Sequence, residues 1–244
     1  MKKKFSKIFS ILILGVLGGM IFQAFILPYL ATKPYFQRFN FIKILTQREV
    51  IINQAPNEII VEENTVLQNA IEKVQKSVVG VRAQSTQGKI IEGTALILTN
   101  DGYFVALYSI LPRGHDFKLF LEDGTQPKFK IIKASSQENL ALAQIEKTDL
   151  AATPFAETGS IRLGQRVFLI GIAFEKGVPK KVVNEGIIKS VNESIIETNI
   201  YEKASLQGSP LFNIKGEIIG LSTIDKSGQV SAIPVAKIRE FAGF

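Results

Sequence analysis

Apolar residues form one long run near the start of the chain and then return in short groups separated by polar turns. No charged residue occurs from Ile8 to Thr32. This run exceeds the roughly 20 apolar residues that a helix needs to cross a bilayer, so it predicts a transmembrane helix. A cleaved signal peptide is the alternative, because it also combines a basic start with an apolar stretch. The length of the run and the lack of a clear Ala-x-Ala site favour an uncleaved anchor.

The flanks of this run predict its orientation. Four lysines lie within the first seven residues, which places the N-terminus in the cytoplasm and the rest of a single-pass protein outside it. Tyr29 and the aromatic residues from Tyr35 to Phe41 resemble an interfacial belt. Gly15 and Gly19 have the spacing of a helix-pairing motif, although glycine is common in any membrane helix. We expect an anchor over residues 1–32 and a juxtamembrane tether over 33–63.

Beyond the tether the periodicity changes from helical to alternating. Apolar positions from Val66 to Val74 follow one helical face and predict a short helix over 64–76. Short β-rich runs then alternate with turns such as Asn100-Asp101-Gly102, in which glycine supplies positive φ. The expected strands include Val78–Ala83, Thr94–Leu98, Tyr103–Leu107, Phe117–Leu121, Phe129–Ile132, Leu140–Ile145, Arg166–Ile170, Val182–Val191, Ile195–Ile200, Leu211–Phe212, Glu217–Ile224 and Gln229–Pro234.

This order predicts a mainly β domain over 64–244 that contains two packed six-stranded barrels. The first barrel covers about 77–150, the second about 160–236, and a short helix follows from Val235. With 46% hydrophobic residues in a chain of 244, the domain has enough apolar side chains for a substantial core.

Composition narrows the function further. The net charge is +7, but Lys2, Lys3, Lys4 and Lys7 carry four of these charges and residues 33–49 carry a net three. Residues 51–244 are therefore formally neutral, and we expect no nucleic-acid partner. The absence of cysteine and the single histidine, His115, exclude disulfides, thiol catalysis and a multi-histidine metal site. We expect neither a metal ion nor a cofactor.

Several motifs occur in an order that resembles the trypsin-like serine proteases, in particular the HtrA/Deg branch. Three carry most of the likeness: residues 93–105 (GTALILTNDGYFV), residues 139–145 (NLALAQI) and residues 205–211 (SLQGSPL) followed by Gly-Glu-Ile-Ile-Gly. The resemblance covers about 64–238 and implies a trypsin-like double β-barrel. No PDZ domain is expected in this sequence.

The same resemblance implies that all three catalytic positions have been replaced. Ser109 stands where the family has its histidine, Asn139 where it has its aspartate, and Gln207 where it has its nucleophilic serine. A serine triad needs a hydroxyl nucleophile, an imidazole base and a carboxylate that orients the base. The loop that forms the oxyanion hole is also altered, since Ser205 replaces a glycine although Gly208 is retained. The resemblance therefore implies a pseudoprotease.

Two substitutes for the lost groups are conceivable. Ser209 would be the nucleophile if the loop had shifted by two residues, and His115 would be its base. A serine in Gly208-Ser209-Pro210 more simply turns the chain, and a lone histidine in a polar loop is more often solvated than catalytic.

Three functions follow from the resemblance. The first is an inactive membrane-anchored protein that binds an extended peptide or protein along Leu221, Ser222, Thr223 and Ile224, by addition of a β-strand. The second is a residual serine endopeptidase that uses Ser209. The third is a regulatory subunit of an active paralogue, in a homo- or hetero-oligomer formed through the membrane helix.

Overall fold

A computed structural model describes residues 2–26, 29–30 and 63–244 of the chain. Residues 33–62 of the predicted tether, which include the aromatic residues from Tyr35 to Phe41, lie outside the described residues, and its last residue, Glu63, is the first of a helix. The chain divides into two compact units, Met1–Ile59 and Ile60–Phe244. In the first unit, helix α1 (Lys2–Ile21) continues into a π-helical turn, η1 (Phe22–Ile26).

The apolar part of this first unit has the length of a membrane span. An 18-residue window, Phe9–Ile26, has a mean hydropathy of 2.2, and none of it is buried. By length and composition this helix is able to cross a membrane, and a signal sequence near the N-terminus would meet the same criteria. The apolar helix predicted from the sequence is thus present.

The second unit begins with the predicted amphipathic helix. Helix α4 (Glu63–Val74) and the 3-10 turn η3 (Gln75–Ser77) lead directly into the first strand. Ala70 and Val74 are buried on one side of α4, and Gly216 of the second barrel lies close to Val74. The helix therefore covers part of the barrel surface with the apolar face that its sequence pattern indicates.

The first six strands form one antiparallel sheet in the order β4-β1-β2-β3-β6-β5. Their bounds are β1 Val78–Ser85, β2 Ile90–Ile97, β3 Tyr103–Leu107, β4 His115–Phe120, β5 Phe129–Ser135 and β6 Leu140–Ile145. No ladder of described residues joins β4 to β5. The rings of Phe117 and Phe129 lie 6.0 Å apart across this seam, so side chains pack where backbone hydrogen bonds would close a regular barrel.

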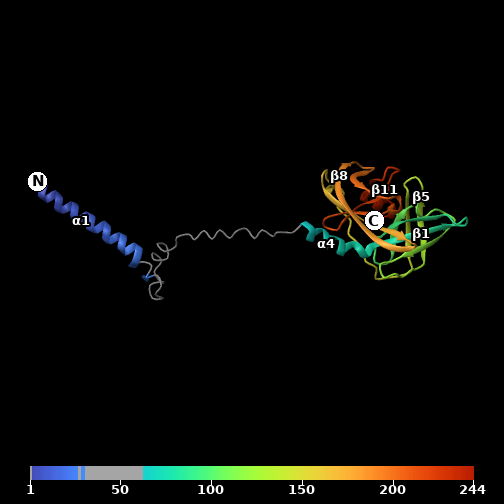
Figure 1. Cartoon of the computed structure of the whole chain (residues 1–244), viewed down its shortest axis with the longest axis horizontal. Coiled ribbons are helices and arrows are strands. Elements are labelled where there is room, and N and C mark those ends of the chain that lie inside the picture. The colour runs from blue at the N-terminus through green and yellow to red at the C-terminus, as the bar shows by residue number, and fades with distance from the viewer. Residues whose placement is uncertain (1, 27–28, 31–62) are drawn as a thin grey trace. The chain divides into compact units, whose positions relative to one another are not determined.

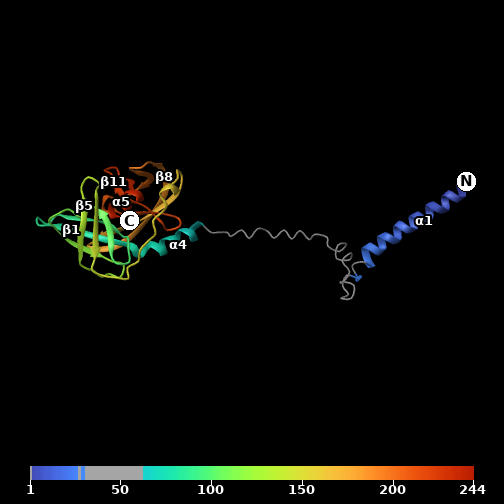
Figure 2. The ribbon, with the colours of Figure 1, turned by 180° about the vertical axis from the view of Figure 1, so that it is seen from behind.

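The last six strands form a closed barrel in the order β10-β11-β12-β9-β8-β7. They are β7 Arg166–Glu175, β8 Val178–Val191, β9 Ile196–Tyr201, β10 Pro210–Asn213, β11 Ile218–Ile224 and β12 Gln229–Pro234, followed by helix α5 (Val235–Ala242). The mainly β, two-barrel architecture predicted from the sequence is confirmed. The strands of the first sheet lie beside the orange and red strands of the second (Figures 1 and 2).

A tight interface joins the two barrels. Strand β7 contacts β1 and β2, and a Cβ added at Gly80 would lie 2.8 Å from Ile172 Cγ2 and 3.0 Å from Phe174 Cζ. The Thr94 hydroxyl accepts a hydrogen bond of 2.8 Å from Ile172 N–H in this buried contact. Because the catalytic positions implied by the sequence lie on both barrels, this interface determines how those positions meet.

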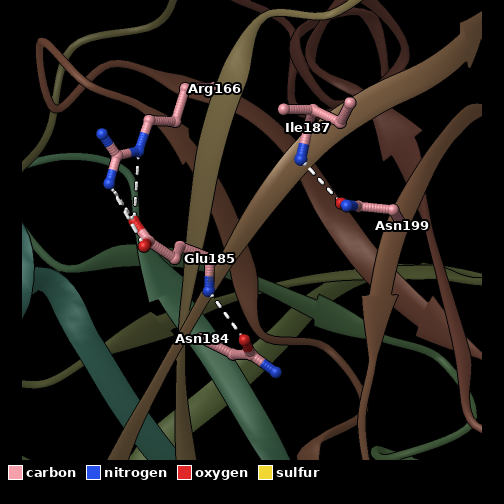
Figure 3. Close-up of polar contacts among 5 residues, drawn as sticks. All are labelled: Arg166, Asn184, Glu185, Ile187 and Asn199. Atoms are coloured by element: carbon pink, nitrogen blue, oxygen red, sulfur yellow. Dashed lines mark hydrogen bonds and ion pairs between the residues drawn. The ribbon is translucent and has the colours of Figure 1, made fainter.

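The long strand β8 leaves its partner β9 part-way along. The β8–β9 ladder runs from Val191↔Ile196 to Ile188↔Thr198 and stops there. Beyond this point, side chains accept hydrogen bonds from the β8 backbone in place of β9 carbonyls (Figure 3). Asn199 Oδ1 accepts the Ile187 N–H at 2.7 Å. Asn184 Oδ1 likewise accepts the N–H of Glu185 at 2.8 Å. At the open part of the β8 edge, the N–H groups of Ile187 and Glu185 are thus satisfied by asparagine side chains.

This arrangement requires a glycine at position 186. A Cβ there would overlap Asn199 Oδ1 and lie 2.7 Å from Ile200 Cγ1. We therefore expect Gly186→Ala to lower the free energy of unfolding by about 2 kcal/mol, as measured by urea denaturation followed by circular dichroism. In an Asn199→Ala background the same change should be less harmful, because the overlapping amide is gone. Equal losses in both backgrounds would contradict this explanation.

Candidate functional site at the junction of the barrels

Ser109 and Asn139 are brought together by the pairing of β3 with β6. Leu107 at the end of β3 lies opposite Leu140 at the start of β6, so the turn after one strand lies beside the turn before the other. Asn139 Oδ1 accepts a hydrogen bond of 3.0 Å from the Ser109 N–H. The Asn139 backbone has φ +52°, in the left-handed region that asparagine tolerates better than most residues. Its amide therefore fixes a backbone N–H of the Ser109 turn.

The loop that carries Gln207 packs against this same turn. A 3-10 turn, η5 (Ala204–Leu206), ends at Gln207, and the Gln207 carbonyl accepts the Thr94 N–H of β2 at 2.9 Å. Ile110, the neighbour of Ser109, lies against Gly208: a Cβ at that glycine would be 2.8 Å from Ile110 Cδ1. Thus the segments carrying Ser109, Asn139 and Gln207 adjoin one another.

The side chain of Gln207 does not point at a hydroxyl or an imidazole. Its Nε2 donates a hydrogen bond of 2.6 Å to the carbonyl oxygen of Ile224, the last residue of β11. A carboxamide has no useful basicity and no nucleophilic oxygen at neutral pH. The Gln207 side chain therefore acts as an amide hydrogen-bond donor at the end of β11.

The backbone N–H groups of the loop are largely used within the protein. Gln207 N–H donates to Ala204 O at 3.2 Å, and Gly208 N–H donates to Ser222 O at 3.0 Å. An oxyanion hole needs donors that are aimed at a reacting oxygen and are not otherwise paired. The loop of Ser205 and Gly208 therefore holds these two N–H groups on carbonyls of its own chain.

Ser209 has a structural environment. It is fully buried, its Oγ donates to Leu206 O at 2.6 Å, and it lies 3.4 Å from Thr94 Oγ1. His115 lies far along the first sheet: it is opposite Ser85 on β1, whereas Thr94 is opposite Gly80. These five residues of strand correspond to roughly 16 Å. The structure does not bring His115 to Ser209.

The proposed peptide segment at the end of β11 is buried on most of its side chains. Leu221 and Ser222 are fully buried, Ile224 is buried, and Thr223 is half-buried. Within the described residues, Ser222 Oγ is buried without a hydrogen-bond partner. Leu221 lies between Pro210 of β10 and Ile233 of β12, so its backbone is already within the sheet. What this segment offers a ligand is thus mainly backbone at its far end.

Alternation along β11 defines which backbone groups face away from β12. Ser222 N–H donates to Ser209 O at 2.8 Å, and Ser222 O accepts from Gly208, so both groups point toward the Gln207 loop. Residues two apart in a strand point to the same side. The N–H and C=O of Ile224 therefore also face this side, beyond Pro210, where β10 begins. The contact from Gln207 agrees with that direction.

A charged turn follows immediately. The Ser227 hydroxyl donates to Asp225 Oδ1 at 2.7 Å and the Gln229 N–H donates to it at 2.9 Å. These bonds, that of the Ser227 hydroxyl above all, hold the pKa of the Asp225 carboxyl below its ordinary value. An aspartate is already ionised at neutral pH, and the depressed pKa extends the pH range over which Asp225 is an anion further toward acid.

Among the described residues, no three His, Cys, Asp or Glu side chains are grouped so that they could hold a metal ion.

Comparison with known proteins identifies the scaffold. Residues 86–221, more than half of the chain, match the family described as the trypsin-like peptidase domain. The chain is an HtrA/Deg-like member of the trypsin-like peptidase family. Among curated proteins it is similar to a probable periplasmic serine endoprotease, DegP-like, of Halomonas elongata (25% identical over 139 residues). A protein of Rhizobium meliloti with the same description is 26% identical over 153 residues.

Solved structures of proteases have the same fold. The serine endoprotease from Yersinia pestis superposes with a TM-score of 0.66 at 20% identity, over 72% of this chain and 65% of that one. The HtrA-type protease AlgW with tripeptide superposes with a TM-score of 0.65 at 22% identity, over 72% and 62%. The two curated relatives match over 54% and 59% of this chain, which spans only about 30% of their length. These likenesses establish the fold and leave the chemistry to the residues of this HtrA/Deg-like chain.

Sequence reasoning missed the part played by Thr94, and it named Ile224 without its contact to Gln207. The Thr94 backbone and hydroxyl connect the Gln207 loop with strand β7, and the Ile224 carbonyl is the partner of Gln207. A signal for the second was available in principle, because a glutamine at the end of a short turn presents an amide that needs a partner. The identity of that partner depends on the fold.

Proposed function

We propose that this HtrA/Deg-like chain is a catalytically inactive homologue that binds extended or unfolded polypeptide at the end of β11. The observation that carries the proposal is the contact of Gln207 Nε2 with Ile224 O. Gln207, which stands at the position that the resemblance assigns to the nucleophile, presents an amide. Its contact shows that the Ile224 carbonyl at the strand edge accepts an amide N–H. One structural relative is an HtrA-type protease solved with a tripeptide, which supports a peptide as the class of ligand.

The neighbouring residues support inactivity. Ser109 and Asn139 contact each other through a backbone N–H and an amide oxygen, so neither an imidazole nor a carboxylate is supplied. The Ser209 hydroxyl is buried and donates a hydrogen bond to Leu206 O, which weighs against an endopeptidase that uses this serine. An added strand needs only backbone groups and survives the loss of the triad.

The location follows from the first unit. The apolar helix that contains Phe9–Ile26, with four lysines before it, is proposed to anchor the chain with its N-terminus in the cytoplasm. The HtrA/Deg-like domain then lies outside the cytoplasm, where two of its curated relatives are described as periplasmic.

Backbone methylation of the ligand tests strand addition without altering the protein. Peptides of alternating sequence, labelled for fluorescence anisotropy, are titrated with the full-length protein in detergent. Methylating the amide nitrogens that face β11 should weaken binding at least tenfold, because each such N–H is a donor to the sheet edge. Methylating the alternate amides, which face solvent, is the matched control and should change affinity little. Equal sensitivity to both patterns would refute strand addition.

A further inference from the structure

The contact between Gln207 and Ile224 has a second consequence for this edge. The Ile224 carbonyl faces away from β12, as do the groups of Ser222, and an incoming strand would have to place one of its own N–H groups on that oxygen. In the structure the carbonyl is already occupied by Gln207 Nε2 at 2.6 Å.

The Gln207 side chain is able to move independently of its loop. Two hydrogen bonds hold its backbone. The Gln207 N–H donates to Ala204 O at 3.2 Å, and the Gln207 carbonyl accepts from the Thr94 N–H at 2.9 Å. Gly208 is also fixed, because its N–H donates to Ser222 O. The side chain, by contrast, is half-buried and is hydrogen-bonded to Ile224 O. Rotation about its side-chain bonds therefore suffices to open the edge.

A primary carboxamide is the side-chain group that most resembles a peptide bond. It presents an N–H donor and a C=O acceptor, as a strand of a ligand would. We propose that Gln207 is a built-in gate that occupies the Ile224 carbonyl in place of a peptide and must be displaced when a peptide binds. This inference rests on the proposed peptide-binding function and adds to it a regulating and specificity-determining residue.

The size of the effect follows from competition. When only part of the molecules has an open edge, the apparent dissociation constant is the intrinsic constant divided by the open fraction. A neutral hydrogen bond has a net stability of about 1 kcal/mol, which corresponds to a ratio of about five. Removing the gate should therefore tighten peptide binding about fivefold, because the fraction of molecules with an open edge rises.

Two substitutions open the gate in different ways. Gln207→Ala removes the amide, and Gln207→Glu keeps nearly the same shape but presents a carboxylate that cannot donate to a carbonyl at neutral pH. Gln144→Ala is the matched control. Gln144 lies on strand β6, and its Nε2 also donates to a backbone carbonyl, that of Asp101, at 3.3 Å. This contact lies on the first sheet and away from β11.

The experiment is anisotropy titration of full-length protein in detergent with the labelled, unmethylated alternating peptide, after circular dichroism has shown that each variant is folded. We expect about fivefold tighter binding for Gln207→Ala, a similar gain for Gln207→Glu with a neutral peptide, and no change for Gln144→Ala. Binding of the same strength in all four proteins would overturn the gate and leave the proposed function standing. If none of the four binds, the proposed function fails and the gate fails with it. If Gln207→Ala does not fold, the Gln207→Glu result decides between these outcomes.

Discussion

The full-length protein is expected to leave denatured casein and fluorogenic peptides uncleaved. In a serine protease, loss of the nucleophile or of the base lowers turnover about a million-fold, and we propose from the family resemblance that Gln207 and Ser109 replace both. The Gln207 N–H that would help to stabilise an oxyanion is bound to Ala204 O. Turnover should therefore stay at the background of the assay over many hours.

Three matched variants show whether any residual cleavage belongs to this protein. Ser209→Ala should change nothing, because the Ser209 hydroxyl is buried on Leu206 O. Gln207→Ser should not create turnover either, since no imidazole is supplied at position 109. Ser109→Ala serves as a negative control in the same preparation. Cleavage that disappears specifically in Ser209→Ala, together with labelling of Ser209 by a fluorophosphonate, would contradict the proposed inactivity.

Replacing Gly208 with alanine should destabilise the domain by about 4 kcal/mol. Gly208 has φ +78°, a conformation that is strained by roughly 1–2 kcal/mol for a residue with a Cβ. Its Cβ would also overlap the Thr94 carbonyl oxygen and lie 2.8 Å from Ile110 Cδ1, and overpacking of this kind costs about 1–3 kcal/mol. The measurement is urea unfolding of the full-length protein in detergent, followed by circular dichroism.

Gly88→Ala provides the control for backbone strain alone. Gly88 has φ +82°, close to that of Gly208, but a Cβ there meets nothing within 4 Å. We expect a loss of only about 1 kcal/mol. A loss for Gly208→Ala no greater than that for Gly88→Ala would mean that the Gln207 loop is not packed against β2 and the Ser109 turn as described.

Much of the architecture was predictable because local and global signals agree. The apolar face from Val66 to Val74 became α4, and the Asn100-Asp101-Gly102 turn joins β2 to β3 with Gly102 at φ +94°. The strand Gln229–Pro234, whose half-buried and buried residues alternate, has the predicted ends. In these segments the residue pattern alone specifies the buried face.

Strands that depend on partners were predicted too short. β7 was expected to end at Ile170 and β8 to begin at Val182, but they extend to Glu175 and from Val178. The added residues include Pro179, Lys180 and Lys181, which disfavour a strand by local propensity. They are strand because the β7–β8 ladder continues through Ala173↔Lys180 to Glu175↔Val178, where β7 also contacts the first sheet.

The sequence pointed to the segments that the structure brings together, and it did not reveal their contacts. Motif order indicated Ser109, Asn139 and Gln207, but three facts required the tertiary structure: the bond from Gln207 to Ile224, the burial of Ser209, and the use of the Gln207 N–H within the loop. Ile224 is 17 residues from Gln207, and a side-chain bond to a backbone carbonyl leaves no mark on the partner's side chain. Such a contact therefore has no signature in a single sequence.

The most direct test of the central proposal measures binding and cleavage in one sample. A labelled extended peptide is titrated with the full-length protein, anisotropy is recorded, and the same mixture is analysed by mass spectrometry after prolonged incubation. We predict a saturable rise in anisotropy, sensitive to methylation of the amides that face β11, with the peptide recovered intact. Recovery of peptide fragments, or the lack of any saturable binding, would contradict a peptide-binding scaffold without protease activity.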